Sequence, residues 1–269
     1  MAKKQEETAL AVMEEAYPIL YGGAEEASMA LAENMAGEQF EAFDLPRLTV
    51  PSGSSSVWAD PFDEDETMKT VEGIILFQRR GRSYWAMGLD EGGGSTPPDC
   101  FSDDGKNGEL RIVDTDSETQ DPMGRTASPT HPGLYSCDDC PFSKWGSDKK
   151  GRGQACKAMR VMFILMPGSF IPVMVTIPPS SLKAVQKFLL TLSGKGIPYW
   201  RAVTTLGLEK SKNQDSIDFQ KITFGIQRRL SGTDGEAIDA FRLNMLPALK
   251  SVSTLDTQED DLAEDLDDD

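Results

Sequence analysis

Residues 158–196 read AMRVMFILMPGSFIPVMVTIPPSSLKAVQKFLLTLSGKG, and this stretch decides the fold class. The run from Val161 to Met166 is continuously apolar, and a second apolar run ends at Pro178 and Pro179. Short apolar runs bounded by proline and glycine are typical of buried strands. The stretch therefore predicts two strands in quick succession.

The second half of this stretch predicts an amphipathic helix over 180–194. Ser180 or Ser181 is a suitable N-cap, and Gly194 is a suitable end. Helical spacing brings five apolar side chains to one face of this helix: Leu182, Val185, Phe188, Leu189 and Leu192. We expect that face to cover the sheet formed by the strands.

The flanking sequence adds four more strands and a final helix. Residues 71–87, VEGIILFQRRGRSYWAM, predict a strand, a turn at Arg80-Gly81 and a return strand. Residues 199–210 and 217–230 predict two further strands joined by a polar turn, and residues 233–252 predict a helix. About six strands with one intervening helix predict a mainly β (α+β) protein with an OB-like antiparallel barrel.

Composition divides the chain into three regions. Residues 1–70 are acidic, with two weakly apolar helical stretches before a Pro- and Ser-rich extended part. Residues 71–250 are the expected OB-like core, interrupted by a Gly- and Asp-rich insertion at about 90–157. Residues 251–269 are the expected disordered tail, because a dense run of acids repels itself.

Four cysteines lie in loop-like parts of the insertion. Cys137 and Cys140 form a CxxC pair, Cys156 follows after fifteen intervening residues, and Cys100 precedes the pair. Four thiolates with this spacing are typical of a structural, tetrahedral Zn²⁺ site. Such an ion would order an insertion that is otherwise too long for a compact domain. His131, the only histidine, is an alternative fourth ligand in place of Cys100.

Other roles for the thiols are less well supported. The start MAKKQEETALAV has no apolar signal region, so we expect a reducing compartment, the cytoplasm, where disulfides are disfavoured. A redox CxxC usually lies between a strand and a helix, whereas this pair follows the turn-forming HPGLYS. A third possibility, beside a zinc site and disulfide or redox chemistry, is that the thiols are free and bind no metal.

The net charge of −17 hides a basic middle. Residues 1–72 hold 4 bases and 16 acids, and residues 256–269 hold nine acids and no base. Residues 141–230 hold 15 bases and only 4 acids. A cationic region of this kind attracts phosphates over about one Debye length.

Aromatic residues alternate with the bases, as a single-stranded nucleic acid requires: cations hold its phosphates and flat rings stack on its bases. The predicted DNA contacts are Arg79, Arg80, Arg82, Tyr84, Lys144, Trp145, Lys149, Lys150, Arg152, Lys157, Tyr199, Trp200, Arg201 and Lys221. Each could instead be an ordinary core or surface residue, and Trp85 and Phe224 have the most core-like settings.

Enzyme signatures are not found. One histidine excludes most His-dependent triads and HExxH sites, and the segment GSDKKGRGQACK lacks the spacing of a Walker A loop. The pairs Asp103-Asp104 and Asp138-Asp139 are more typical of solvated turns than of a Mg²⁺ site. We therefore expect a protein that binds and does not catalyse.

Taken together, the expected small β-barrel, the inserted cysteine site, the aromatic and basic segments and the acidic tail resemble the plan of bacteriophage-type single-stranded DNA-binding proteins, above all the zinc-containing T4-type helix-destabilising family. The tail is similar to that of the T7-type family, and residues 96–160 are similar to an element of phage and prophage proteins. The resemblance implies that Cys100, Cys137, Cys140 and Cys156 hold zinc. The T4-type site differs in using one histidine and three cysteines, and its basic N-terminal arm has no counterpart here.

The resulting hypothesis is a sequence-independent single-stranded DNA-binding protein of phage replication or recombination, located in the host cytoplasm and without contact to a membrane. The acidic tail, with Leu262 and Leu266 between its acids, would compete with DNA for the basic surface and recruit replication or recombination proteins. The alternative is a zinc-containing phage adaptor or regulator that binds proteins only. A zinc-ribbon factor that reads duplex DNA lacks a basic recognition helix in this sequence.

Overall fold

The described part of the chain is mainly antiparallel β-sheet with a few helices. In a computed structural model, the structure describes residues 13–23, 25, 29–30, 33–34, 45–51, 53, 55–86, 97–111, 119–120, 126–127, 134–212, 216 and 218–253. The chain divides into two compact units, which are Met1–Gln78 with Met162–Ser251 (unit 1) and Arg79–Val161 with Val252–Asp269 (unit 2).

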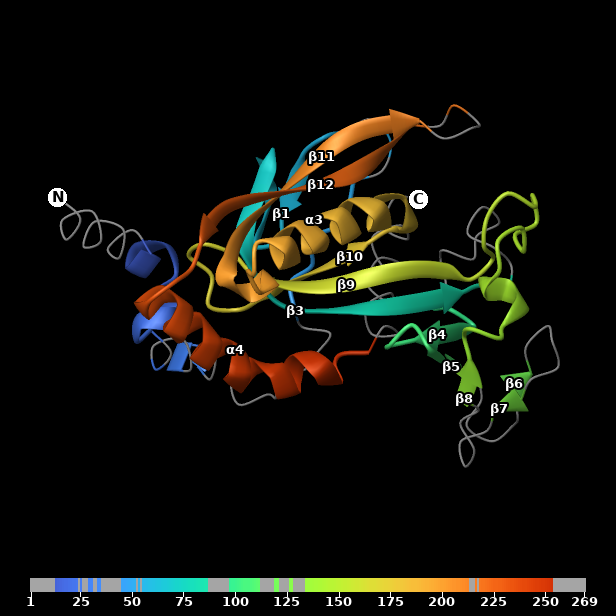
Figure 1. Ribbon diagram of the computed structural model, residues 1–269, viewed down its shortest axis with the longest axis horizontal. Coiled ribbons are helices and arrows are strands. Elements are labelled where there is room, and N and C mark those ends of the chain that lie inside the picture. Colours follow the sequence, from blue (N-terminus) through green and yellow to red (C-terminus); the bar gives the residue numbers. More distant parts are fainter. Residues whose placement is uncertain are drawn as a thin grey trace. The chain divides into compact units, whose positions relative to one another are not determined.

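The strands form one large sheet and two small ones (Figure 1). The large sheet is ordered β10-β9-β3-β4-β5-β8, and β11 pairs with both β3 and β12. Its strands are β3 (Thr70–Tyr84), β4 (Cys100–Ser102), β5 (Asn107–Leu110), β8 (Leu134–Ser136), β9 (Lys157–Leu165), β10 (Val173–Ile177), β11 (Ala202–Lys212) and β12 (Asp218–Arg229). The two-stranded sheets are β1 (Trp58–Asp60) with β2 (Asp63–Met68), and β6 (Thr119–Gln120) with β7 (Thr126–Ala127).

Two helices are long, α3 (Leu182–Gly194) and α4 (Thr233–Ser251). The other helical elements are short 3-10 turns: η1 (Pro18–Tyr21), η5 (Pro141–Ser143), η6 (Pro179–Ser181) and η7 (Tyr199–Arg201). The predicted helices over 180–194 and 233–252 are thus confirmed. No helix in the described part of the chain is long and apolar enough to span a membrane.

The described strands do not close into a barrel, which corrects that part of the prediction, and the OB-like arrangement stays unconfirmed. Within the described strands, β12 has β11 as its ladder partner and reaches no other strand of the sheet. β3 uses Thr70–Ile74 to pair with β11 and Arg82–Tyr84 to pair with β4. Because one long strand serves two different partners along its length, the sheet branches at β3 and does not return on itself.

The length of β3 also overturns the predicted turn at Arg80-Gly81. These two residues lie inside a single strand of 15 residues. Gly81 is buried, and it is not among the described glycines with a positive φ angle. A glycine without that backbone conformation does not mark a tight turn, and the residues after it, Arg82–Tyr84, continue the strand by pairing with β4.

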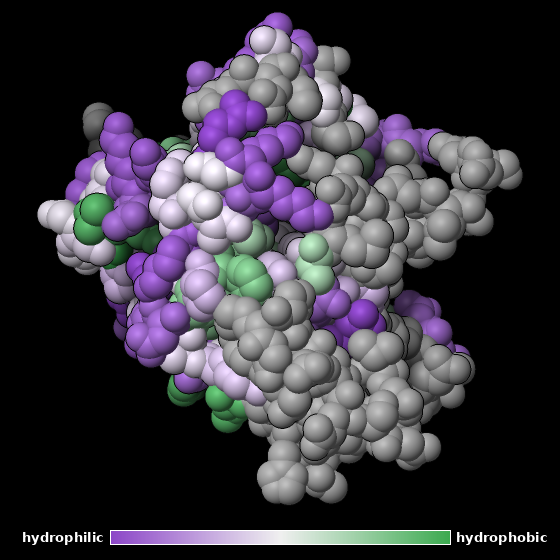
Figure 2. Space-filling model, turned by 90° about the vertical axis from the view of Figure 1, so that its right-hand side faces the viewer, coloured by the Kyte–Doolittle hydropathy of each residue, from purple (hydrophilic) through white to green (hydrophobic). Residues whose placement is uncertain are grey.

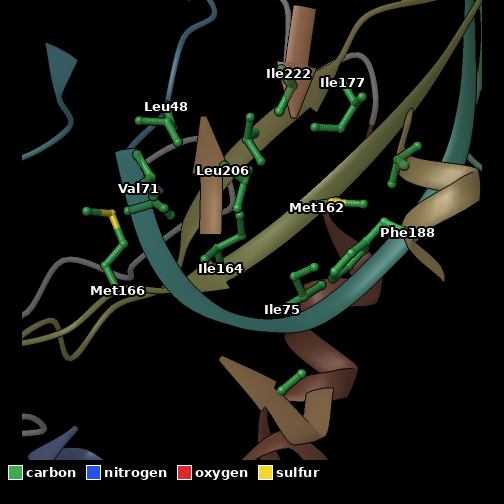
Figure 3. Close-up of a cluster of buried hydrophobic side chains, with 14 of the residues drawn as sticks. Leu48, Val71, Ile75, Met162, Ile164, Met166, Ile177, Phe188, Leu206 and Ile222 are labelled. Atoms are coloured by element: carbon green, nitrogen blue, oxygen red, sulfur yellow. The ribbon is translucent and has the colours of Figure 1, made fainter. Parts of the chain in front are cut away.

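Unit 1 is built around a buried apolar cluster (Figure 3). Met162 and Ile164 of β9, Val71 of β3 and Leu206 of β11 are fully buried. From the predicted face of α3, Val185, Phe188 and Leu192 are buried, while Leu182 and Leu189 are partly buried against the cluster. The amphipathic pattern of 180–194 therefore identified the face that covers this core.

Two details of unit 1 depend on small residues. A Cβ atom at Gly73 would lie 2.4 Å from Ile164 Cγ2 and 2.8 Å from the Leu165 carbonyl oxygen, so only glycine fits at this crossing. Ser181 precedes α3 but its hydroxyl makes no capping bond. It accepts a hydrogen bond from the Ile222 N–H at 2.9 Å instead, which attaches the start of α3 to β12.

Candidate metal and nucleic-acid site

The four cysteines come together in unit 2. Cys100 begins β4, Cys137 and Cys140 follow β8, and Cys156 directly precedes β9. All four line one small cavity of about 10 Å³. That volume is about the space required for a single water-sized sphere. Residues up to 56 positions apart thus share a space that suits one ion.

Antiparallel pairing explains how these distant residues meet. β4 pairs with β5 and β5 pairs with β8, which places Cys100 and the start of the CxxC turn on either side of β5. The Cys137 N–H donates to the Lys106 carbonyl at 2.7 Å, and the Cys156 N–H donates to the Phe142 carbonyl at 2.9 Å. Backbone hydrogen bonds therefore hold the thiol-bearing segments in place.

Gly108 gives the thiols their room, and the sequence interpretation missed it. A Cβ atom at this position would lie 3.3 Å from Cys100 Sγ and 3.5 Å from Cys137 Sγ. Gly108 follows Asn107, and an Asn-Gly pair usually predicts a turn, whereas both residues lie in β5. The missing side chain leaves the space beside both sulfur atoms open.

The thiols converge without forming a complete ligand set. None of the four described cysteines is in a disulfide. Among the described residues, no group of three or more His, Cys, Asp or Glu side chains has the arrangement of a metal site. Shared lining of one cavity is nevertheless a direct geometric relation among the four side chains. Four sulfur donors around a one-ion space match the chemistry of tetrahedral Zn²⁺.

Positive charge lies beside the thiols. Burial raises the pKa of the Cys156 thiol to about 11, while the charge of Arg82 and its hydrogen bond to this thiol act to lower the pKa. Burial also raises the pKa of Cys137, against a hydrogen bond from Ser102 and the charge of Arg82. Arg82 Nη1 is buried with no hydrogen-bond partner among the described atoms. Thiolates in this cluster would place negative charge beside this guanidinium.

The position of Tyr84 corrects one predicted DNA contact. Its ring is buried and stacks on Phe142, with ring centroids 4.3 Å apart. Both residues line the cysteine cavity. The prediction assumed an exposed ring next to a turn, but β3 continues through that position. Tyr84 lines the cavity of the thiols and Arg82 hydrogen-bonds the Cys156 thiol, so both side chains are engaged within the protein.

The segment between Cys140 and Cys156 is an ordered turn with its own hydrogen bonds. The Gly146 N–H donates to the Gly153 carbonyl at 2.7 Å, and the Arg152 N–H donates to Asp148 Oδ1 at 2.7 Å. The Ser147 hydroxyl donates to the Phe142 carbonyl and accepts from the Ala155 N–H. We call residues 141–157 the basic turn, since they hold five bases and one acid.

The basic turn presents a large exposed ring among its cations. Trp145 is 79% exposed, the highest exposure among the large apolar side chains of the described residues. Lys144, Lys149, Lys150 and Arg152 are exposed on the same turn. Gly146 and Gly151 have φ angles of 85° and 65°, a conformation that favours glycine. Figure 2 shows one face of the molecule, where described hydrophilic residues are more extensive than described hydrophobic ones.

Three further residues of unit 2 that the sequence predicts as DNA contacts differ in their burial and in their bonding partners. Arg79 is largely buried and forms an ion pair with Asp103, at an N–O distance of 3.1 Å. Lys157 is half-buried and donates to the Gln154 carbonyl at 2.8 Å. Arg80 is exposed on β3. Of these three residues, Arg80 is the one with a strongly exposed side chain.

In unit 1, the aromatic and basic residues of η7 hold α4. Asp239 accepts hydrogen bonds from Trp200 Nε1 at 2.8 Å and from Arg201 Nε at 3.1 Å. The Arg242 guanidinium lies 4.0 Å from the Trp200 ring centre and hydrogen-bonds the Tyr199 hydroxyl. These contacts give Tyr199, Trp200 and Arg201 a packing role that the sequence interpretation did not foresee. Lys221 of β12 lies over the Phe219 ring, at 5.5 Å.

Two parts of the sequence interpretation lie outside the described residues. These are His131, the alternative metal ligand, and the acidic tail at 256–269. Comparison of the chain with protein-family models, with curated proteins and with solved structures gives no match.

Proposed function

We propose that this chain is a single-stranded DNA-binding protein that acts without sequence preference, in phage replication or recombination. The observation that supports this most is the basic turn, in which an ordered backbone presents Trp145 at 79% exposure among exposed lysines and an arginine. Flat exposed rings stack on unpaired bases and nearby cations hold phosphates, which is the combination that single-stranded nucleic acid requires.

The second part of the proposal is that Cys100, Cys137, Cys140 and Cys156 hold a structural Zn²⁺. The shared cavity and the buried Arg82 Nη1 beside the thiols support this donor set. Zinc would link β4, the CxxC segment and the start of β9 to one another. Its role is therefore to fix both ends of the basic turn, and no catalytic step is involved.

Each part of the turn has a distinct task in binding. Trp145 stacks on a base, which contributes about 1–3 kcal/mol per base in proteins of this kind. Lys144, Lys149, Lys150 and Arg152 neutralise phosphates, and Arg80 is an additional exposed cation of unit 2. None of these contacts reads a base edge, so we expect binding to tolerate any sequence.

A titration with labelled oligonucleotides tests the proposal. We expect fluorescence anisotropy to show binding to a 30-residue oligothymidine and much weaker binding to a duplex of equal length, because paired bases cannot stack on Trp145. The logarithm of the binding constant should fall linearly with the logarithm of salt concentration, by about 0.7 per phosphate contacted. Equal affinity for duplex and single strand would contradict the proposal.

The acidic tail is proposed to compete with DNA for the basic turn and to recruit partner proteins. Deleting residues 256–269 removes nine acids. We expect the truncated protein to bind oligothymidine more tightly than the full chain at low salt, with a difference that shrinks as salt screens the charges. Anisotropy titrations at several salt concentrations measure this.

Two matched tails separate charge from length in that experiment. A tail with the same residues in scrambled order should inhibit as the natural tail does. A tail of equal length, with Asn and Gln in place of the acids, should behave like the deletion. If all three variants bind DNA with the affinity of the full chain, the tail does not compete with DNA.

An adaptor function is the second candidate, and one feature of unit 1 favours it. A groove of about 920 Å³ is lined by apolar side chains that include Phe62, Met68 and Met166, and by the acids Asp60, Asp63 and Glu66. Such a groove suits a protein segment with apolar and basic residues. A chain that binds no oligonucleotide in the titration above would favour this candidate.

A further inference from the structure

The basic middle of the chain contains a long segment without any acid. Residues 149–208 hold nine Lys and Arg and no Asp or Glu, in a chain that has 44 acids among 269 residues. The basic turn accounts for the first part of this segment. A second part forms α3 and the turn after it, in unit 1.

Helix α3 directs its cations outward. Because Val185, Phe188 and Leu192 face the core, the helical repeat places Lys183 and Lys187 on the exposed side. The helix contains no acidic residue in Leu182–Gly194, and Lys195 directly follows it. The exposed side of α3 therefore carries positive charge with no acid of its own.

Between α3 and β12 lies a groove of about 430 Å³, within the size range of small ligand sites. Its lining combines cations with an apolar floor, and none of its members is acidic: Ala184, Lys187, Phe188, Thr191, Lys195, Thr223, Phe224, Gly225 and Ile226. The rings of Phe188 and Phe224 are stacked, with centroids 5.4 Å apart. Phe224 is half-buried, so part of its ring is accessible from the groove.

We propose that this groove is a second contact site for single-stranded nucleic acid, in which Lys187 and Lys195 hold phosphates and a base lies against Phe224 and Ile226. The inference rests on the proposed function for the class of ligand. It rests on separate residues for the site, because the groove contains none of the DNA contacts predicted from the sequence. Charge decides the occupant, since two exposed lysines without an acid favour a polyanion.

Lysine footprinting tests this site directly. The full-length protein is acetylated with limiting acetic anhydride, with and without saturating 30-residue oligothymidine, and mass spectrometry measures modification at each lysine. We expect protection at Lys187 and Lys195. Lys69 and Lys250, exposed elsewhere in unit 1, should be modified equally in both samples. Equal modification of Lys187 and Lys195 with and without DNA would overturn the inference.

A pair of double variants gives a second, independent readout. Lys187→Ala with Lys195→Ala should make the salt dependence of the logarithm of the binding constant shallower by about 1.4, at about 0.7 per phosphate lost. The control, Lys69→Ala with Lys250→Ala, removes the same charge and should leave the slope unchanged. An unchanged slope in the groove variant overturns the second site.

The outcomes separate the two proposals. Protection at Lys149 and Lys150 without protection at Lys187 and Lys195 rejects the groove and retains the proposed function. Protection in the groove alone supports the groove and rejects the basic turn as the contact. Absence of any binding or protection rejects both.

Discussion

Replacing Cys137 or Cys156 by serine is expected to abolish zinc binding and to loosen the basic turn. Wild-type protein should carry about one zinc per chain, and each variant should carry close to none, because structural zinc sites bind with apparent free energies of about 10–16 kcal/mol that depend on the complete thiolate set. Both cysteines are buried at the shared cavity, so a hydroxyl there offers a poorer ligand. Elemental analysis of purified protein measures the zinc content.

Limited proteolysis measures the loosening in the same samples. We expect cleavage at Lys144, Lys149, Lys150 and Arg152 by trypsin to accelerate strongly in the serine variants, since zinc would fix both ends of this segment. Ser83→Ala is the matched control, because it removes one oxygen from a fully buried site of unit 2 and leaves the thiols unchanged. A serine variant that retains a full zinc equivalent, or wild-type protein without zinc, would rule out the proposed site.

Trp145→Ala is expected to weaken binding of single-stranded DNA by roughly 5- to 150-fold, the equivalent of about 1–3 kcal/mol for one stacked base. The side chain is 79% exposed, so its removal leaves no cavity in the core and should not change the melting temperature. Anisotropy titrations with oligothymidine measure the affinity, and circular dichroism confirms the fold.

Two further variants sharpen this prediction. Phe62→Ala removes another exposed aromatic ring, at 52% exposure in unit 1, and should leave DNA affinity unchanged. Trp145→Phe retains a flat ring and should recover most of the lost affinity. Wild-type affinity in Trp145→Ala would show that the ring does not stack on a base.

The elements of unit 1 could largely be predicted from the sequence. The apolar run at Val161–Met166 and the 3.6-residue spacing in 180–194 are local signals, and both correspond to observed elements. Closure of the sheet is not a local property. It depends on which strands pair at long range, and the 15-residue β3 pairs with β11 and β4 along different parts of its length.

The candidate site could be predicted in part. Cysteine spacing indicated that the four thiols would meet, because ligand spacing reflects the geometry of the ion. The residues around them carried no such signal. Gly108 leaves space beside two sulfur atoms. Arg82 and Tyr84 lie beside the thiols because β3 continues without a turn as far as Tyr84. A turn predicted at Arg80-Gly81 had placed these side chains at the surface.

The packing role of η7 shows the same limit. Tyr199, Trp200 and Arg201 have the composition of a nucleic-acid contact, yet Asp239 and Arg242 of α4 already engage them. Composition alone cannot distinguish an aromatic and basic cluster that binds a ligand from one that binds the protein's own helix. The positions of partner residues some 40 residues later in the chain decide it.

If zinc held by the four thiols fixes the basic turn, binding of single-stranded DNA should depend on zinc. Oligothymidine titrations compare zinc-loaded protein, the same protein after chelation, and the chelated protein after zinc is restored. We expect tight binding, then a loss of affinity of roughly the size expected for Trp145→Ala or larger, then recovery. Unchanged affinity in zinc-free protein that retains its circular dichroism spectrum would contradict this expectation.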